Sequence, residues 1–538
     1  MGNFCSELIT SVMVLPITAG YYRRRQNGSG YYDVTISSMV FFIVFLSIVI
    51  VFTVSQDIDI EQDKRLAIVF LLLSTIMIFG MIACVALVCV IKKLGVEYVV
   101  SSRRQGSVIK LQLIFLSIFG LLAGLFSALL VGQQIECGVF SPNIVGIRGF
   151  FWDNRCIFNI ITMLFLVVEM LFISYFARFH LKRSTSVRYV LFLLVCANVS
   201  VWLHSVIINN EPFPERILDR EFGNKSKIPA CLQKATFGNL INISQPILKP
   251  CFLEFCLLSI TMLLEMWSPI TIQQTSEEEL PIYQEMVDSS YHVNETERAT
   301  LLEHTEFTES ILSGGHTNQK VYQLVSFFVS IIIGLVFITF YVIWVSHPDS
   351  SQIRKATDQY YASITVAMIV AVFVGFYCLV HYCKPERTPK PLKVSEYVYL
   401  SSALGIVMLH VCEVLSAYIT PDDTKDILMS TYILALVQVY LQVVFLLHAS
   451  RCRKTVTNSR IHLLECVLIF LIIINLTIWI SDSFVIEQFV EIKAIEQDIL
   501  GDVLWSLYHN ILLPASVFFR FSSALEMFAT FQLHSARH

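Results

Sequence analysis

Several polar side chains stand inside long apolar stretches of this sequence. Glu169, Glu254 and Glu413 interrupt apolar runs, and Gln438 and Gln442 lie four residues apart, so that a helix would place them on one face. An ionised group at the centre of a membrane helix costs roughly 2.5–3.5 kcal/mol on insertion scales, and such groups are therefore functional candidates. A buried carboxyl group can load and release protons, and an amide can donate and accept hydrogen bonds without titrating. Together these residue types predict a path for protons.

The same polar and aromatic signature occurs twice, as "NVSVW" from Asn198 to Trp202 and as "NLTIW" from Asn475 to Trp479. Both copies fit the pattern for N-glycosylation, but each lies in an apolar run, where no sugar would be attached. Asparagine and tryptophan are four residues apart in both copies, and a helix would turn them to one side. Two interpretations stay open: the asparagine joins neighbouring helices by a hydrogen bond worth about 0.6 kcal/mol, or it belongs to a proton path.

Charged residues and prolines in the last apolar run of each half give further candidates. Glu254 follows Pro250 by four residues, and we interpret it either as a relay or gate for protons or as a polar group that locks helix packing. A structural role is favoured for Arg520, because a guanidinium is always charged and is a poor proton relay. Pro250 and Pro514 each free a backbone carbonyl from its helical partner, which predicts a kink.

The composition is typical of a protein dissolved in lipid. The chain is 55% hydrophobic and 15% charged, with a mean hydropathy of +0.66, and its net charge of −4 gives no indication of nucleic-acid binding. The 14 cysteines fall mostly in apolar runs or basic loops, which argues against a dense disulfide scaffold but leaves one bridge among Cys137, Cys156 and Cys231 open. No Walker A, HExxH or paired CxxC motif occurs, so no enzyme activity, cofactor or structural metal is predicted.

About twelve apolar runs are long enough to cross a membrane, since a span needs roughly 20 residues. Only helices that satisfy their own backbone groups can do so, and the predicted fold class is therefore an all-α polytopic membrane protein of two six-helix repeats. The predicted spans are 35–54, 66–91, 109–131, 156–177, 187–208 and 245–267, followed by 321–345, 359–383, 395–418, 428–448, 461–481 and 503–530.

Lysine and arginine in the short loops predict the orientation. Basic loops such as "RFHLKRSTSVR" and "RCRKTVTNSR" alternate with acidic loops, and we place the basic loops and both termini in the cytoplasm. The loop 209–244 is then extracellular, with Asn224 and Asn242 as candidates for glycosylation. The predicted domains are an N-terminal segment 1–34, a six-helix bundle 35–267, a polar cytoplasmic linker 268–320, a second bundle 321–530 and a C-terminal segment 531–538.

The two predicted bundles carry matching residues in the same order, which indicates an internal duplication. Glu169 aligns with Gln442, the two pentapeptides align with each other, and Pro250 aligns with Pro514. Because each set has an even number of spans, both halves enter the membrane the same way up, and the repeat is parallel. The aligned pair is chemically unequal, since a glutamate can titrate and a glutamine cannot.

The stretches "CANVSVWLHSVI", "ILKPCFLEF" and "LWSLYHNILLPASVFFRF" resemble those of the otopetrins, a family of proton-selective channels. The resemblance covers most of the chain and implies a dimer whose four six-helix bundles form a pseudo-tetramer around sterol or lipid. It also implies a constellation of Gln, Asp or Asn, and Tyr. Here Glu169 stands in place of a Gln, and Phe519 stands in place of the expected Tyr of the second half.

The resemblance also makes two histidines candidates for pH sensing or zinc binding, because the family is known for block by external zinc. His204 lies near the predicted outer end of its span, and His347 lies just outside another span. Either side chain titrates in the range where acid sensing matters and could bind zinc. The plainer interpretation, a solvated histidine at the membrane interface, is favoured for His347 and stays open for His204.

We therefore expect a proton-selective channel of the plasma membrane that carries H⁺ into the cell in response to external acid. Its expected partners are protons, a lipid or sterol, and a second copy of the chain. The alternative is a proton-coupled secondary transporter with a substrate site between two parallel halves, a plan built on inverted repeats that the sequence does not indicate. The candidates for the proton path or its gate are Glu169, Asn198, Glu254, Glu413, Gln442 and Asn475, and those for packing or gating are Trp202, Trp479, Pro250, Pro514 and Arg520.

Overall fold

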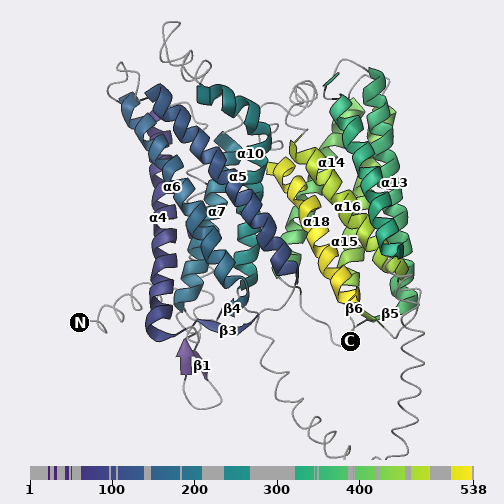
Figure 1. Ribbon diagram of the computed structural model, residues 1–538, viewed down its shortest axis with the longest axis horizontal. Helices are drawn as coiled ribbons and strands as arrows, with labels where there is room; N and C mark the ends of the chain where they lie inside the picture. The colour runs from purple at the N-terminus through teal and green to yellow at the C-terminus, as the bar shows by residue number, and fades with distance from the viewer. Residues whose placement is uncertain are drawn as a thin grey trace, which may run out of the picture. The chain divides into compact units, whose positions relative to one another are not determined.

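The structure is a computed structural model in which nearly every described residue is helical (Figure 1). The predicted linker 268–320 and Asn224 lie outside the described residues, whereas the backbone of Asn242 lies inside a helix. The described residues are 22–24, 30–32, 43–47, 50, 62–95, 99–103, 107–138, 147–181, 185–208, 236–266, 321–344, 346–347, 351–385, 392, 394–419, 425–454, 462–484 and 511–535.

Ten of the described helices are long and apolar enough to cross a membrane, which confirms a polytopic membrane protein. The predicted span 35–54 falls mostly outside the described residues. The ten helices are α4 (Gln62–Leu94), α5 (Ser107–Gly138), α6 (Ile147–Phe176), α7 (Thr185–Ile208), α10 (Thr236–Met266), the helix Val321–Trp344, α13 (Ser351–Tyr382), α14 (Val394–Ile419), α15 (Lys425–Ala449) and α16 (His462–Phe484).

The last predicted span, 503–530, differs from the helix that the structure places there. Helix α18 (Leu513–Ser535) follows a π-helical turn at residues 511–512 and continues beyond the predicted end. It is not among the ten apolar helices, because it carries Arg520, two adjacent serines and His534. These polar side chains are buried, so α18 packs inside its bundle and does not need a lipid-facing surface.

The chain divides into two compact units, which we describe separately. Unit 1 comprises Met1–Trp267 and His509–Pro514, and unit 2 comprises Ser268–Tyr508 and Ala515–His538. In unit 1 the apolar windows of α7 and α10 are 78% buried, whereas those of α4, α5 and α6 are 39–44% buried. Helices α7 and α10 therefore form the centre of unit 1. Around them α4 packs on α6 and α7, and α5 packs on α6 and α10.

Unit 2 repeats several of these relationships. Helix α13 packs on α15 and α16, and α14 packs on α15, as α4 packs on α6 and α7 and α5 packs on α6. Helix α16 is the most buried of the unit's apolar helices, and the helix Val321–Trp344 is the least buried. Gly375 marks a close approach of α13 and α15, because a Cβ atom at this position would lie 2.6 Å from Cε2 of Phe445.

A short antiparallel sheet stands at one end of each unit. In unit 1, β3 (Val100–Arg103) follows α4 and pairs with β4 (Phe179–Leu181), which follows α6. In unit 2, β5 (Cys383–Pro385) follows α13 and pairs with β6 (Cys452–Lys454), which follows α15. We call this the sheet end of each unit. A third pair, β1 (Tyr22–Arg24) with β2 (Gly30–Tyr32), lies near the N-terminus.

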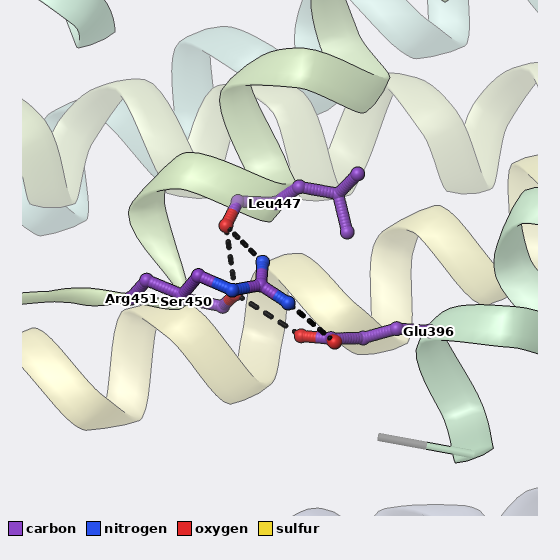
Figure 2. Close-up of polar contacts among 4 residues, drawn as sticks. All are labelled: Glu396, Leu447, Ser450 and Arg451. Atoms are coloured by element: carbon purple, nitrogen blue, oxygen red, sulfur yellow. Dashed lines mark hydrogen bonds and ion pairs between the residues drawn. The ribbon is translucent and has the colours of Figure 1, made fainter. Parts of the chain in front are cut away.

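An ion pair fixes α14 against the end of α15 near the sheet of unit 2 (Figure 2). The guanidinium of Arg451 donates to Glu396 Oε2 at 2.8 Å and to the carbonyl of Leu447 at 2.6 Å. Ser450 also donates to Glu396, at 3.3 Å. Arg451 thus satisfies a carbonyl at the C-terminus of α15 and complements the helix dipole, as a cation does at this end of a helix.

Candidate functional site

A carboxyl group and an amide meet inside unit 1. Asn198 on α7 donates its side-chain amide to Glu169 Oε1 on α6 and to the carbonyl of Leu194, at 2.9 Å, one turn earlier on its own helix. Glu169 is 0% exposed and Asn198 is 1% exposed. The structure therefore brings together two residues that the sequence singled out separately, and it does so within a bundle of apolar helices.

An amide pair occupies the matching place in unit 2. Gln442 on α15 donates to Asn475 Oδ1 on α16 at 3.2 Å, and Asn475 donates back to Gln442 Oε1 at 3.3 Å. Asn475 also donates to the carbonyl of Leu471, at 2.8 Å, one turn earlier. Both side chains are 0% exposed. The hydrogen bond to the preceding turn is thus the same for Asn475 as for Asn198.

The two pairs occupy the same helical positions. Glu169 is followed by seven further residues of α6, which ends at Phe176, and Gln442 by seven further residues of α15, which ends at Ala449. Asn198 lies thirteen residues after Thr185, the first residue of α7, and Asn475 thirteen residues after His462, the first residue of α16. The difference between the pairs is therefore chemical: one contains an acid and the other contains only amides.

The pair in unit 1 keeps unused hydrogen-bonding capacity. Among the described residues, Glu169 Oε2, Asn198 Oδ1 and the Trp202 Nε1 atom one turn further along α7 are buried and have no hydrogen-bond partner. Buried polar atoms of this kind call for water or for a mobile proton carrier, because leaving them unpaired costs free energy. The thiols of Cys84 on α4 and Cys256 on α10 lie close enough to Glu169 to interact with it electrostatically.

The amides of unit 2 belong to a longer polar column headed by a cation. Arg520 Nη1 on α18 donates to Gln438 Oε1 at 2.9 Å, and Gln438 Nε2 donates to Gln442 Oε1 at 2.6 Å. Arg520 is 1% exposed, and its guanidinium carbon lies 5.7 Å from the centroid of the Phe519 ring. The column therefore runs from Arg520 through Gln438 and Gln442 to Asn475.

Two titratable groups that the sequence analysis did not single out, Asp482 and Tyr361, lie within electrostatic range of this cation. Asp482 on α16 and Tyr361 on α13 interact electrostatically with Arg520, and Asp482 also senses Glu413. His410 and Glu413 on α14 are joined at 2.6 Å. The sequence placed Asp482 in an acidic loop after residue 481, but it lies inside α16, which ends at Phe484. The missed signal was its position seven residues, or about two turns, after Asn475 on the same helix.

A tyrosine joins the second site from an unexpected helix. Phe519 stands where the family resemblance implied a tyrosine, and the Tyr399 ring of α14 stacks on it with centroids 5.3 Å apart. Ser523 on α18 donates to the Tyr399 hydroxyl at 3.5 Å. Unit 2 thus has a buried phenol beside its polar column, supplied by a residue distant in sequence from Phe519.

The remaining candidates are distributed over both units. Glu254 lies buried on α10, four residues beyond Pro250, and Pro250 is inside the helix whereas Pro514 is the second residue of α18. Pro514 directly follows the π-helical turn 511–512 and Leu513, and the kink predicted there stays a prediction. Trp479 packs on Phe521 with ring centroids 5.4 Å apart.

The two histidine candidates differ in accessibility. His204 is 4% exposed and lies against Phe70 and Phe158, with ring centroids 5.3 and 5.0 Å away, and it senses the charge of Arg155. His347 is exposed just beyond the helix that ends at Trp344. In the part of the chain that the structure describes, no group of three His, Cys, Asp or Glu side chains could hold a metal ion.

The structure tests one of the three cysteines that the sequence left as candidates for a disulfide bond. Cys156 lies within α6 and has a free thiol, so it does not join the bridge that the sequence left open. The side chains of Cys137 and Cys231 lie outside the described residues.

Comparisons with known proteins point in one direction. The family model described as Otopetrin matches residues 209–521, which is more than half of the 538 residues. A relative from Drosophila melanogaster described as "Proton channel OtopLc" is 21% identical over 328 residues, which is 59% of this chain and 19% of that protein. This chain thus spans about a fifth of the length of that relative. Gln442 and Asn475 fall inside the matched segment, and Glu169 and Asn198 precede it.

Proposed function

Because this chain belongs to the otopetrin family, we propose that it is a proton-selective channel of the plasma membrane, through which external acid drives H⁺ into the cell. The relative described as a proton channel supports this proposal, as do the ten apolar helices. Buried carboxyl and amide groups inside membrane helices are typical of ion pathways and proton relays, which favours a channel over an enzyme.

The observation that carries the proposal is the contact between Glu169 and Asn198. A carboxyl group that is 0% exposed can hold a proton on either oxygen, and its Oε2 atom has no protein partner among the described residues. Asn198 holds the other oxygen in place while its own Oδ1 atom stays available to water. Glu169 would accept a proton from a water on one side and release it on the other, so no continuous aqueous pore is needed.

We further propose that the chain is a parallel duplication of twelve spans with both termini in the cytoplasm. The matching positions of the two polar pairs and the sheets β3–β4 and β5–β6 support the duplication. Basic residues such as Arg451, Arg453 and Lys454 lie at the sheet end of unit 2, which supports placement of the sheet ends in the cytoplasm. The predicted boundaries 35–267 and 321–530 for the two bundles belong to the same proposal.

The proposed assembly is a homodimer with lipid or sterol at its centre, which is what the family resemblance implies. Exposed apolar residues on the helix Val321–Trp344, 17% buried within the chain, are compatible with a surface that faces lipid or a second copy. The mass of the purified protein in lipid nanodiscs, measured with and without added sterol, tests this assembly.

Purified protein in liposomes tests the proposed function. A K⁺ gradient with valinomycin sets the membrane potential, and a trapped pH dye reports proton influx. We expect acidification of the lumen that depends on the protein and needs no other ion or solute. A secondary transporter would acidify the lumen only after its substrate is added, and the absence of any flux from correctly inserted protein would contradict both functions.

A further inference from the structure

The polar column of unit 2 begins at a group that can give hydrogen bonds but cannot take a proton. Arg520 Nη1 donates to Gln438, Gln438 donates to Gln442, and Gln442 donates to Asn475. A guanidinium has five N–H donors and no acceptor, and it stays protonated in proteins. A proton that moves along a chain of hydrogen bonds must be accepted by each group in turn. Arg520 cannot accept one, so protons cannot enter the column at its Arg520 end.

The charge of Arg520 adds a second obstacle. An excess proton on Gln438 would stand within hydrogen-bond distance of a fixed cation, because Arg520 Nη1 lies 2.9 Å from Gln438 Oε1. At 1% exposure the guanidinium is not screened by bulk water. Fixed arginines exclude protons and cations from other membrane pores by the same electrostatic effect.

Groups from α13, α14 and α16 interact electrostatically in the region of Arg520. Asp482 on α16 supplies a counter-charge, and Tyr361 on α13 contacts the guanidinium. Glu413, which is joined to His410 on α14, adds negative charge in the same region. These groups lower the cost of a buried cation, and the guanidinium still presents an N–H donor to Gln438.

Unit 1 carries no such cation at the matching position. Arg520 stands six residues after Pro514, and the residue six positions after the aligned Pro250 is Cys256. The thiol of Cys256 lies in electrostatic range of Glu169 and is uncharged when protonated. The position that holds the cation in unit 2 therefore holds a thiol in unit 1, the unit in which Glu169 pairs with Asn198.

We propose that Arg520 is a selectivity-determining barrier that excludes protons from the polar column of unit 2 and confines the flux to unit 1. This inference rests on the proposed proton-channel function. It assigns Arg520 a role in the flux itself, because the donor-only head and the fixed charge are both properties of this one side chain.

Whole-cell recording of acid-evoked current in the full chain tests the barrier. The wild type should conduct, and Glu169→Gln should be nearly silent at equal surface density. Adding Arg520→Gln to Glu169→Gln should restore current by at least about threefold, since removal of the fixed charge opens the amide column. Arg520→Lys, which keeps the cation, is the matched control and should restore none.

A second variant keeps the test decisive if Arg520→Gln does not reach the surface. Arg520→Gln combined with Asp482→Asn removes the fixed charge without leaving the Asp482 carboxyl group as an uncompensated buried charge, so in the Glu169→Gln background it should also restore current. A silent wild type would overturn the proposed function itself. A conducting wild type with a current that survives Glu169→Gln, or with no gain from either second-site variant at normal surface density, would overturn the barrier.

Discussion

Asn198 on α7 donates its side-chain amide to the carboxyl group of Glu169 on α6, and Gln442 and Asn475 form the corresponding contact in unit 2. One contact ties a titratable group to its neighbour, and the other ties two groups that cannot titrate. The same helical framework thus holds two chemically different sites. We therefore expect substitutions in the two sites to change proton flux differently.

Replacing Glu169 by alanine should reduce proton flux more than replacing Gln442 by alanine. Glu169→Ala removes the titratable member of the pair, whereas Gln442→Ala removes an amide from a column that is closed by a cation. We expect a loss of about tenfold or more for Glu169→Ala and of less than about twofold for Gln442→Ala. Flux into liposomes at matched protein density is the measurement, and equal effects of the two changes would contradict the assignment.

Replacing each asparagine by leucine should separate conduction from packing. Asn198→Leu leaves Glu169 without its donor and removes the free Oδ1 atom, so the flux should fall severalfold. Asn475→Leu breaks the matching contacts in unit 2 and should leave the flux nearly unchanged.

Both leucine variants should lose a similar, small amount of stability, about 0.6 kcal/mol for an average interhelical hydrogen bond. Thermal unfolding in detergent checks this shared cost. If Asn475→Leu abolished the flux while its unfolding matched that of Asn198→Leu, unit 2 would carry protons.

The ion pair between Glu396 and Arg451 should contribute little to stability, because the Arg451 side chain is 32% exposed. We expect a coupling free energy of about 0.2–1 kcal/mol, which rising salt should reduce. A double-mutant cycle with Glu396→Gln and Arg451→Gln, read by unfolding in detergent, measures it. Coupling well above this range and unaffected by salt would show that the pair is more strongly desolvated than the structure indicates.

Gly375→Ala should destabilise unit 2, because the new methyl group would lie 2.6 Å from Cε2 and 2.8 Å from Cζ of Phe445. Overpacking of this kind costs about 1–3 kcal/mol. Gly124→Ala is the matched control, since a Cβ atom there meets nothing within 4 Å. Phe445→Leu should partly rescue Gly375→Ala by making room. Equal unfolding temperatures for the two alanine variants would contradict the close approach of α13 and α15.

Sequence alone identified the members of both polar pairs, because polar residues are conspicuous in apolar helices and their order is the same in both halves. It could not show that Asn198 reaches Glu169, since the rotation of α6 against α7 depends on packing along the whole bundle. Asp482 was missed because a charge near the end of an apolar run is also typical of a loop. Tyr399 and the short sheets were missed because they depend on contacts between segments distant in sequence.

The reversal potential of the acid-evoked current tests the proposed function most directly. External pH is stepped from neutral to acid in cells that express the chain, and the reversal potential is measured with Na⁺ and Cl⁻ varied independently. For a proton-selective channel, the reversal potential shifts by about 59 mV per pH unit, because one pH unit is a tenfold change in the concentration of a singly charged ion. We expect that shift and no response to Na⁺ or Cl⁻. A reversal potential that follows another ion, or no current from protein shown to be at the surface, would contradict the account.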